Sequence, residues 1–183
     1  MDASQVLFKT NRLNIMEISD LQLRDFSDAN DNIDDLNDFF GKIQNDIVQA
    51  IRNNMLDATA YLGYIHKMIV TNDIMRFGAW DDKNTLVSIV TFKLWSTKEP
   101  EIQIAVEKGS LKRGYGTEFL QGLLTWISQT KDFDHIAYRV RIGNTAGEKL
   151  IHTVGGVLQP DRNSIEALII KTYFLFPSAN TAS

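Results

Sequence analysis

The stretch that most constrains the fold is EIQIAVEKGSLKRGYGTE, residues 101–118. Its first six residues are mostly apolar and favour extended structure, which predicts a strand over 101–106. From residue 114 onward, apolar side chains recur every three or four positions, which predicts a helix over 114–129. The glycine-rich segment between them therefore joins the end of a strand to the start of a helix.

This loop has the properties of an anion-binding site. Glycines let the backbone turn sharply, and the unpaired amides and dipole at a helix start attract negative charge. Lys108, Lys112 and Arg113 outnumber Glu107 in the loop, although the whole chain has a net charge of −4. A phosphate or pyrophosphate is the expected ligand.

Two common phosphate-binding loops do not match these letters. The spacing from Gly109 to Gly114 is that of a Walker A loop, but Tyr115 and Gly116 stand where that loop requires Lys and Ser or Thr. The Gly-x-Gly unit also lacks the third glycine of the dinucleotide fingerprint. Both mismatches argue against a nucleotide-phosphate enzyme.

The rest of the chain reads as a strand, then helices, then three strands, followed by helix, strand, helix and strand. The remaining strands are predicted over 12–18, 74–80, 86–95, 135–142 and 165–176. The remaining helices are predicted from residue 19, over 32–55, around 58–70 and over 145–153. No repeat or linker interrupts this order, so a single domain over 1–183 is expected, with a polar tail at 177–183.

The composition is that of a soluble globular protein, with 44% hydrophobic and 23% charged residues. No apolar run approaches the roughly 20 residues that span a bilayer, so no membrane partner is expected. The absence of cysteine excludes disulfides and a cysteine nucleophile, and is compatible with a cytoplasmic protein. No metal site is predicted, because metal-ligand spacing is lacking among the three histidines, His66, His135 and His152.

Charge is unevenly distributed along the chain. The net negative charge argues against a nucleic-acid partner. Between Glu17 and Asp46 there are nine acidic residues against two basic ones, Arg24 and Lys42. This acidic segment could attract a cationic acceptor, although most charged runs are simply solvated faces.

Residues 101–118 resemble the central motif of the GNAT acetyltransferases, Gln/Arg-x-x-Gly-x-Gly/Ala. Gly114 and Gly116 match the motif, whereas Leu111 stands where Gln or Arg is usual. Further along, NTAGEKLIHTVGG at 144–156 resembles the second motif of the family, in which an asparagine starts a helix that ends at a glycine. The opening Thr10-x-Arg12-Leu13 is similar to that of the subfamily related to ribosomal-protein N-terminal acetyltransferases.

The resemblance implies an α/β fold of the GNAT (acyl-CoA N-acyltransferase) type. Such a fold is a mixed, mostly antiparallel sheet flanked by helices on both sides, opened here near Val106 and Asn144. It implies an N-acetyltransferase that moves an acetyl group from acetyl-CoA, as co-substrate, to a primary amine. The acceptor would be a protein N-terminus or a small amine.

The resemblance also implies a set of cofactor-binding residues. Backbone groups of Ile104, Ala105 and Val106 would pair with the pantetheine arm, and Asn144 would help to position the cofactor. The pyrophosphate would be held through the backbone amides of Leu111, Lys112, Arg113, Gly114, Tyr115, Gly116 and Thr117.

The catalytic groups are less well defined by the resemblance. Glu101 would act as base, directly or through water, or is an ordinary strand-end glutamate in solvent. A backbone amide near Val106 would stabilise the oxyanion. Ile151 occupies the position where family members often have a tyrosine acid, and His152 lies about 100° round the helix from it. Either a different donor or water would then supply the proton, or the chain is a catalytically weak or inactive acyl-CoA-binding or regulatory protein.

Two further expectations concern packing. The large aromatic side chains are expected in the core rather than in a substrate cage; they are Phe77, Trp80, Phe92, Trp95 and Trp126. An edge strand over 165–176 could pair between subunits, which would give a homodimer, or lie covered.

Overall fold

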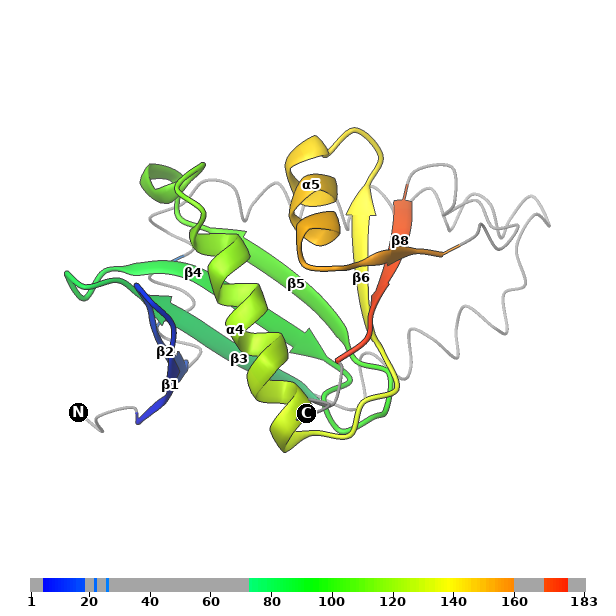
Figure 1. Ribbon diagram of the computed structural model, residues 1–183, viewed down its shortest axis with the longest axis horizontal. Helices are drawn as coiled ribbons and strands as arrows, with labels where there is room; N and C mark the ends of the chain where they lie inside the picture. The colour runs from blue at the N-terminus through cyan, green and yellow to red at the C-terminus, as the bar shows by residue number, and fades with distance from the viewer. Residues whose placement is uncertain (1–4, 19–21, 23–25, 27–72, 160–169, 178–183) are drawn as a thin grey trace, which may run out of the picture.

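The computed structural model of the chain describes residues 5–18, 22, 26, 73–159 and 170–177 (Figure 1). The helices predicted over 32–55 and 58–70 and the helix start predicted at residue 19 lie outside the described residues. The first half of the predicted strand over 165–176 also lies outside them.

One eight-stranded sheet forms the centre of the molecule, in the order β1-β2-β3-β4-β5-β6-β8-β7. Every neighbouring pair is antiparallel except β5 and β6, which are parallel. This confirms the predicted mixed, mostly antiparallel sheet. The strands are β1 (Val6–Lys9), β2 (Asn14–Glu17), β3 (Ile74–Trp80), β4 (Leu86–Lys93), β5 (Glu101–Val106), β6 (Ile136–Arg141), β7 (Val157–Leu158) and β8 (Ile170–Leu175).

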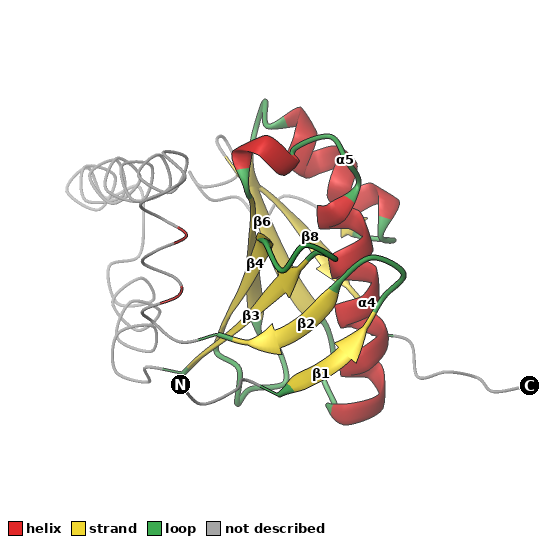
Figure 2. Cartoon of the chain, turned by 90° about the vertical axis from the view of Figure 1, so that its left-hand side faces the viewer, coloured by secondary structure: helices red, strands yellow, loops and turns green. Residues whose placement is uncertain are grey.

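Two α-helices, α4 (Tyr115–Thr130) and α5 (Thr145–Thr153), cover one face of this sheet (Figure 2). A short 3-10 helix, η1 (Lys108–Ser110), precedes α4. The face of α4 that packs on the sheet is fully buried, as the three- and four-residue spacing predicts; its residues are Phe119, Leu120, Leu123 and Ile127.

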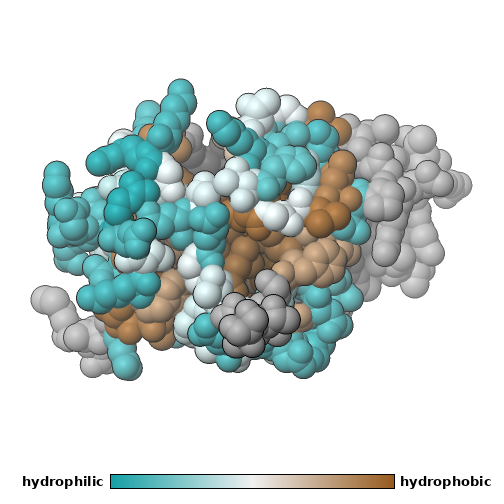
Figure 3. Space-filling view, viewed as in Figure 1, coloured by the Kyte–Doolittle hydropathy of each residue, from teal (hydrophilic) through white to brown (hydrophobic). Residues whose placement is uncertain are grey.

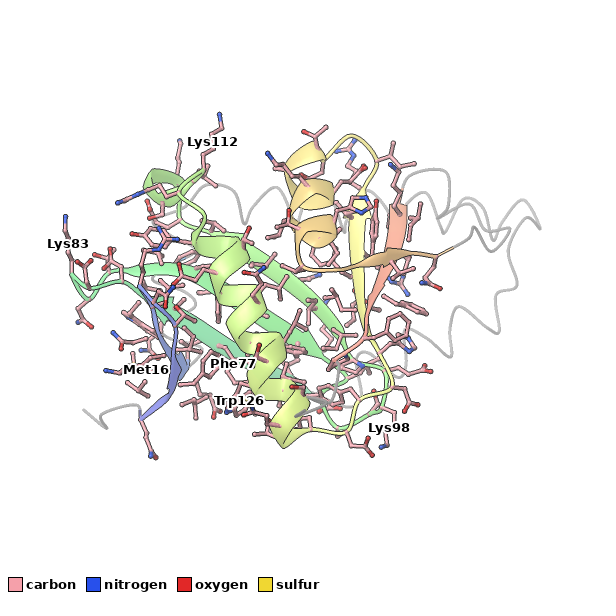
Figure 4. All side chains as sticks on the ribbon, in the orientation of Figure 1. Met16, Phe77, Lys83, Lys98, Lys112 and Trp126 are labelled. Atoms are coloured by element: carbon pink, nitrogen blue, oxygen red, sulfur yellow. The ribbon has the colours of Figure 1, made fainter. Side chains whose placement is uncertain are left out.

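Hydrophobic clusters lie on both faces of the sheet. The larger cluster lies between the sheet and the two helices, and the smaller one contains Ile18, Phe26, Trp80 and Ile89. The core prediction for the aromatic residues is confirmed, because Phe77, Trp80 and Phe92 are buried and the other two tryptophans pack against the larger cluster. Figure 4 shows Phe77 and Trp126 together beside α4, where their rings lie 5.6 Å apart.

The sheet opens between β5 and β6. The two strands pair only at Glu101 with Ala137 and at Ile102 with Tyr138, so residues 103–106 have no partner on β6. The strands diverge from this point toward the starts of α4 and α5 (Figure 1). The predicted opening near Val106 and Asn144 is thus confirmed. We call the space between the diverging strands the gap, and the point where they still pair its vertex.

The edges of the sheet are formed by β1 and β7. Of the two alternatives for the strand predicted over 165–176, the structure shows the covered one, because β8 lies between β6 and the two-residue β7. Neither β1 nor β7 was predicted. Both are very short, and their length gives little room for an alternating pattern.

Candidate cofactor site and active site

The backbone of β5 alternates between its two neighbours. The amide of Glu107, just after the strand, donates to the carbonyl of Val87 in β4 at 2.9 Å. On the opposite edge, the amide of Ala137 in β6 donates to the carbonyl of Pro100 at 2.8 Å. Because backbone groups alternate along a strand, odd-numbered residues of β5 face β4 and even-numbered residues face β6.

Two of the three residues predicted to pair with the pantetheine arm therefore direct their backbone groups into the gap. Ile104 and Val106 turn both N–H and C=O toward the missing part of β6. Ala105 faces β4 instead, and its carbonyl accepts a hydrogen bond from Ser88 Oγ at 2.8 Å. The free edge of β5 offers Ile104 and Val106 to an extended ligand.

In the first turn of the loop, backbone amides donate hydrogen bonds to groups of the loop itself. Glu107 caps η1, because its Oε1 accepts a hydrogen bond from the amide of Gly109 at 2.7 Å. Hydrogen bonds from Ser110, chiefly its hydroxyl, and from the Gly109 amide hold the pKa of Glu107 below its usual value. An anion would meet this carboxylate at η1, so the available anion site begins after Ser110.

The start of α4 is uncapped by any side chain. Its N-cap is Gly114, in the left-handed region at φ 82°. The first helical hydrogen bond runs from the amide of Glu118 to the carbonyl of Gly114 at 3.0 Å. By helix geometry, the amides of Tyr115, Gly116 and Thr117 have no acceptor within the helix. These amides lie where the sequence predicts an anion site, and the binding of an anion by them stays a prediction.

This anion site adjoins the gap. A Cβ on Gly116 would lie 3.0 Å from Val106 Cγ2, so the absence of a side chain lets the helix start approach the end of β5. Lys112, also in the left-handed region at φ 60°, projects away from the body of the molecule above α4 (Figure 4). Leu111 is exposed beside it. The structure therefore brings the predicted loop residues to the open end of the gap.

A clamp from the first hairpin fixes this loop. Glu118 Oε1 accepts hydrogen bonds from Thr10 Oγ1 at 2.6 Å and from the Arg12 amide at 2.8 Å, and Oε2 accepts from Arg12 Nε at 2.6 Å. Arg12 Nη1 also donates to the carbonyl of Arg113 at 3.0 Å. Both arginine guanidiniums lie over the ring of Tyr115. The Thr10-x-Arg12 motif thus has a structural role, through a glutamate that sequence reasoning did not single out.

We expect Glu118→Gln to weaken this clamp and lower the free energy of unfolding at neutral pH by about 1–2 kcal/mol, since charge-assisted hydrogen bonds are lost and Arg12 is half exposed. Burial alone would raise the pKa of Glu118, but the hydrogen bonds from Thr10 and Arg12 outweigh it and hold that pKa below its usual value. A depressed folded-state pKa contributes stability above the unfolded pKa, about 4.3, and this contribution is lost as pH falls through the folded pKa.

Urea unfolding of wild type and Glu118→Gln at pH 7 and near pH 3 checks this prediction. The difference between the two proteins should shrink at the acid pH. Asp82→Asn, in the exposed turn between β3 and β4, is the matched control for loss of one negative charge. An equal difference at both pH values would contradict the assigned role of the carboxylate.

Asn144 starts α5 on the other side of the gap. Its Oδ1 accepts a hydrogen bond from the Gly147 amide at 2.9 Å, so the capping role is confirmed. Capping uses the side-chain oxygen and leaves the side-chain nitrogen available as a donor. Ile142, two residues earlier, is exposed. The contact of Asn144 with the cofactor stays a prediction. The cap is compatible with it, because the side-chain nitrogen is not used.

Glu101 is buried, with 6% of its surface exposed, so its interpretation as a strand-end glutamate in solvent is wrong. Its Oε2 lies 3.2 Å from Arg139 Nε, and Lys93 is its cross-strand neighbour on β4. Burial lowers the pKa of Lys93, the charge of Glu101 raises it, and Arg139 lowers it further. The carboxylate therefore lies between two cations at the vertex. Strand alternation places it on the face of the sheet opposite α4.

The predicted acid position offers no proton. Ile151 is fully buried against the core, and the neighbouring His152 is exposed on α5, with its Nε2 3.4 Å from the hydroxyl of Tyr173. A further tyrosine, Tyr138, pairs through its backbone with Ile102 at the vertex, and burial raises the pKa of its phenol. Sequence reasoning passed over Tyr138 because its position in an alternating strand is typical of a core residue.

Metal-ligand groups and membrane-spanning helices are both absent from the described part of the chain. Within residues 5–18, 22, 26, 73–159 and 170–177, no three His, Asp or Glu side chains are grouped so that they could hold a metal ion. No helix in this described part of the chain is both long and apolar enough to cross a membrane.

Comparison with known proteins places the fold. No protein-family model matches the sequence, and no curated protein matches it. Among solved structures, spermidine N-acetyltransferase from Vibrio cholerae in complex with CoA and spermine is 16% identical, with a TM-score of 0.59 over 93% of this chain and 98% of that one. A chimera of that protein with hSSAT is 14% identical, with a TM-score of 0.61 over 91% of this chain and 96% of the chimera.

The same Vibrio cholerae protein, in a dodecameric intermediate state, is 14% identical, with a TM-score of 0.57 over 94% of this chain and 98% of that one. At such identities the similarity establishes the fold alone. The chain and these acetyltransferases therefore share one architecture over nearly their whole lengths. The likeness of Thr10-x-Arg12-Leu13 to the ribosomal-protein subfamily stays a prediction.

Proposed function

Given the GNAT fold of this chain, we propose that it transfers an acetyl group from acetyl-CoA to a small primary amine. The observation that carries the proposal is the gap, in which the free edge of β5 at Ile104 and Val106 leads directly to the uncapped start of α4. An extended chain with a pyrophosphate at one end fits such a surface. Figure 3 shows a recessed apolar area between α4 and α5, above the diverging strands.

The position of the cofactor follows from these groups. Its pyrophosphate would accept hydrogen bonds from the amides of Tyr115, Gly116 and Thr117, with the preceding residues of the loop beside it. Its arm would pair with Ile104 and Val106 like an added strand. Because the gap closes at Ile102, the thioester would lie near the vertex.

This position changes one sequence-based expectation. The amide of Val106 lies about 17 Å from Glu101, at roughly 3.4 Å per residue, so the two cannot act on the same acetyl group. The amide of Ile104 also faces the gap and lies nearer the vertex. We assign the oxyanion contact to Ile104 and the base to Glu101, acting through a water because its carboxylate already pairs with Arg139.

A small amine is the acceptor that we favour. The similar solved structures are spermidine N-acetyltransferases by name, and one of them contains spermine. The acidic segment from Glu17 to Asp46 is suited by its charge to a polycation. A protein N-terminus is the other primary amine to test.

Calorimetric titration with acetyl-CoA, with ATP in parallel, tests the cofactor, and release of free thiol tests the reaction. Spermidine and a short peptide with a free N-terminus serve as the two acceptor probes. Selective acetyl-CoA binding with thiol release on adding spermidine is the expected result. Binding without thiol release would instead favour an inactive acyl-CoA-binding protein, the function suggested by Ile151. Absence of binding would overturn the proposal.

A further inference from the structure

We propose that Tyr138 is the catalytic acid that protonates the departing thiolate of CoA. This inference rests on the proposed function and deepens it. Attack by a neutral amine breaks the bond between the acetyl carbon and sulfur, and the sulfur leaves as a basic thiolate that is stabilised by receiving a proton. The donor must lie beside the gap near the vertex, where the thioester would be held.

Tyr138 lies on a strand that borders the gap, and its backbone is at the vertex. Its backbone pairs with Ile102, the last bridge before β5 and β6 diverge. Its side chain belongs to the core cluster on the face covered by α4 and α5, which also contains Ile151. The backbone of Tyr138 thus lies at the vertex, on the side of the gap formed by β6.

The hydroxyl lies farther along that side, beside the open part of the gap. A Cβ on Gly147 would be 3.1 Å from Tyr138 Oη and 2.9 Å from Val140 Cγ2. The oxygen is therefore near the level of Val140, two residues beyond the last bridge. Gly147 leaves the space that the hydroxyl needs under the first turn of α5.

This hydroxyl is not occupied by another contact. Among the described residues it has no hydrogen-bond partner, and its oxygen retains some access to solvent. Burial of the ring raises the pKa of the phenol, so the group stays protonated at neutral pH and can act as a donor.

The other described tyrosines are less well placed. Tyr115 lies at the start of α4, under the guanidiniums of Arg12 and Arg113, at the pyrophosphate end of the proposed site. Tyr173 is on β8, one strand farther from the gap, and its hydroxyl lies against His152. Of the three tyrosines that the structure describes, only Tyr138 is on a strand that borders the gap at the vertex.

Acid and base then lie on opposite faces of the sheet, with Glu101 at the vertex and the Tyr138 hydroxyl farther along β6, near the level of Val140. Glu101 pairs with Ala137 and its side chain is on the face away from α4, while the next bridge carries Tyr138 toward α5. The amine nitrogen forms the new bond to the acetyl carbon from the side of Glu101, which takes the amine proton through water. The carbon–sulfur bond breaks, its electron pair goes to sulfur, and the phenol proton follows. The phenolate regains a proton from solvent.

The test is Tyr138→Phe, which removes only the oxygen, with Tyr173→Phe as the matched control. We expect unchanged melting temperature and acetyl-CoA affinity for Tyr138→Phe. We expect thiol release with spermidine to be slower by about 10²–10⁴-fold, the range of general acid catalysis. A second readout needs no acceptor: the pKa of the thiol of bound CoA, followed by thiolate absorbance, should be higher in Tyr138→Phe than in wild type or the control.

The outcomes separate the two proposals. If wild type does not bind acetyl-CoA, the proposed function fails and this inference fails with it. If Tyr138→Phe binds normally and both thiol release and the pKa of the bound thiol match wild type, only the role of Tyr138 is overturned. A change in the bound thiol alone, without turnover on spermidine, would support the contact of Tyr138 with sulfur and direct the search to another amine.

Discussion

Gly114→Glu is expected to abolish measurable binding of acetyl-CoA. The new carboxylate would stand at the N-cap of α4, beside the amides proposed to hold the pyrophosphate. Two unit charges about 5 Å apart repel by roughly 3 kcal/mol at an effective dielectric constant of about 20. That corresponds to at least a hundredfold loss of affinity. Calorimetric titration of the variant with acetyl-CoA measures this loss.

Two controls separate charge from backbone strain. Gly114 is at φ 82°, a conformation that disfavours any side chain, so Gly114→Ala measures strain without charge. Gly155→Glu places the same charge at φ 86° in open space after α5. Both controls should retain most of the affinity. If Gly114→Glu binds acetyl-CoA as tightly as Gly155→Glu, the pyrophosphate is not held at the start of α4.

Glu101→Gln should reduce turnover by about 10²–10⁴-fold while leaving acetyl-CoA affinity unchanged. The amide cannot take up a proton as a carboxylate can, and the side chain lies on the face of the sheet away from the α4 amides. The variant should also be less stable, because Lys93 and Arg139 lose the anion between them. Thiol release at saturating acetyl-CoA and spermidine, with urea unfolding in parallel, separates the two effects.

Glu99→Gln is the matched control, because it removes a carboxylate two residues away whose side chain is largely exposed. Its turnover should equal that of wild type. Normal turnover in a folded Glu101→Gln protein would assign Glu101 to the ionic cluster of the sheet alone. Proton removal from the amine would then belong to another group.

Strong local patterns account for what the sequence predicted. The strand over 101–106, the glycine loop and the periodic helix after it are encoded within 30 consecutive residues, and the structure places all three as expected. The opening of the sheet was predicted only through the family resemblance. Composition and periodicity do not indicate which neighbouring strands diverge.

The contacts that were missed are long-range or look ordinary locally. The clamp between Arg12 and Glu118 joins residues 106 positions apart, so no window of sequence contains both. The cap of η1 did have a signal, a glutamate two residues before Gly109, whose side chain can reach the loop amides. Tyr138 had no such signal in the sequence, because its proposed role depends on the point at which β5 and β6 diverge.

The two bridges between β5 and β6 leave the sheet in two parts that are joined at one point. Strands β1 to β5 form one part and β6 to β8 the other, and among the described residues only the pairs of Glu101 with Ala137 and of Ile102 with Tyr138 join the two parts within the sheet. A ligand that fills the gap would pair with β5 where β6 does not, and would link the two parts of the sheet. At a concentration a hundred times its dissociation constant, such a ligand adds about 2.7 kcal/mol to the folded state. On the proposed binding mode, the concentration of acetyl-CoA in the cell would therefore affect the stability of the folded protein as well as its turnover.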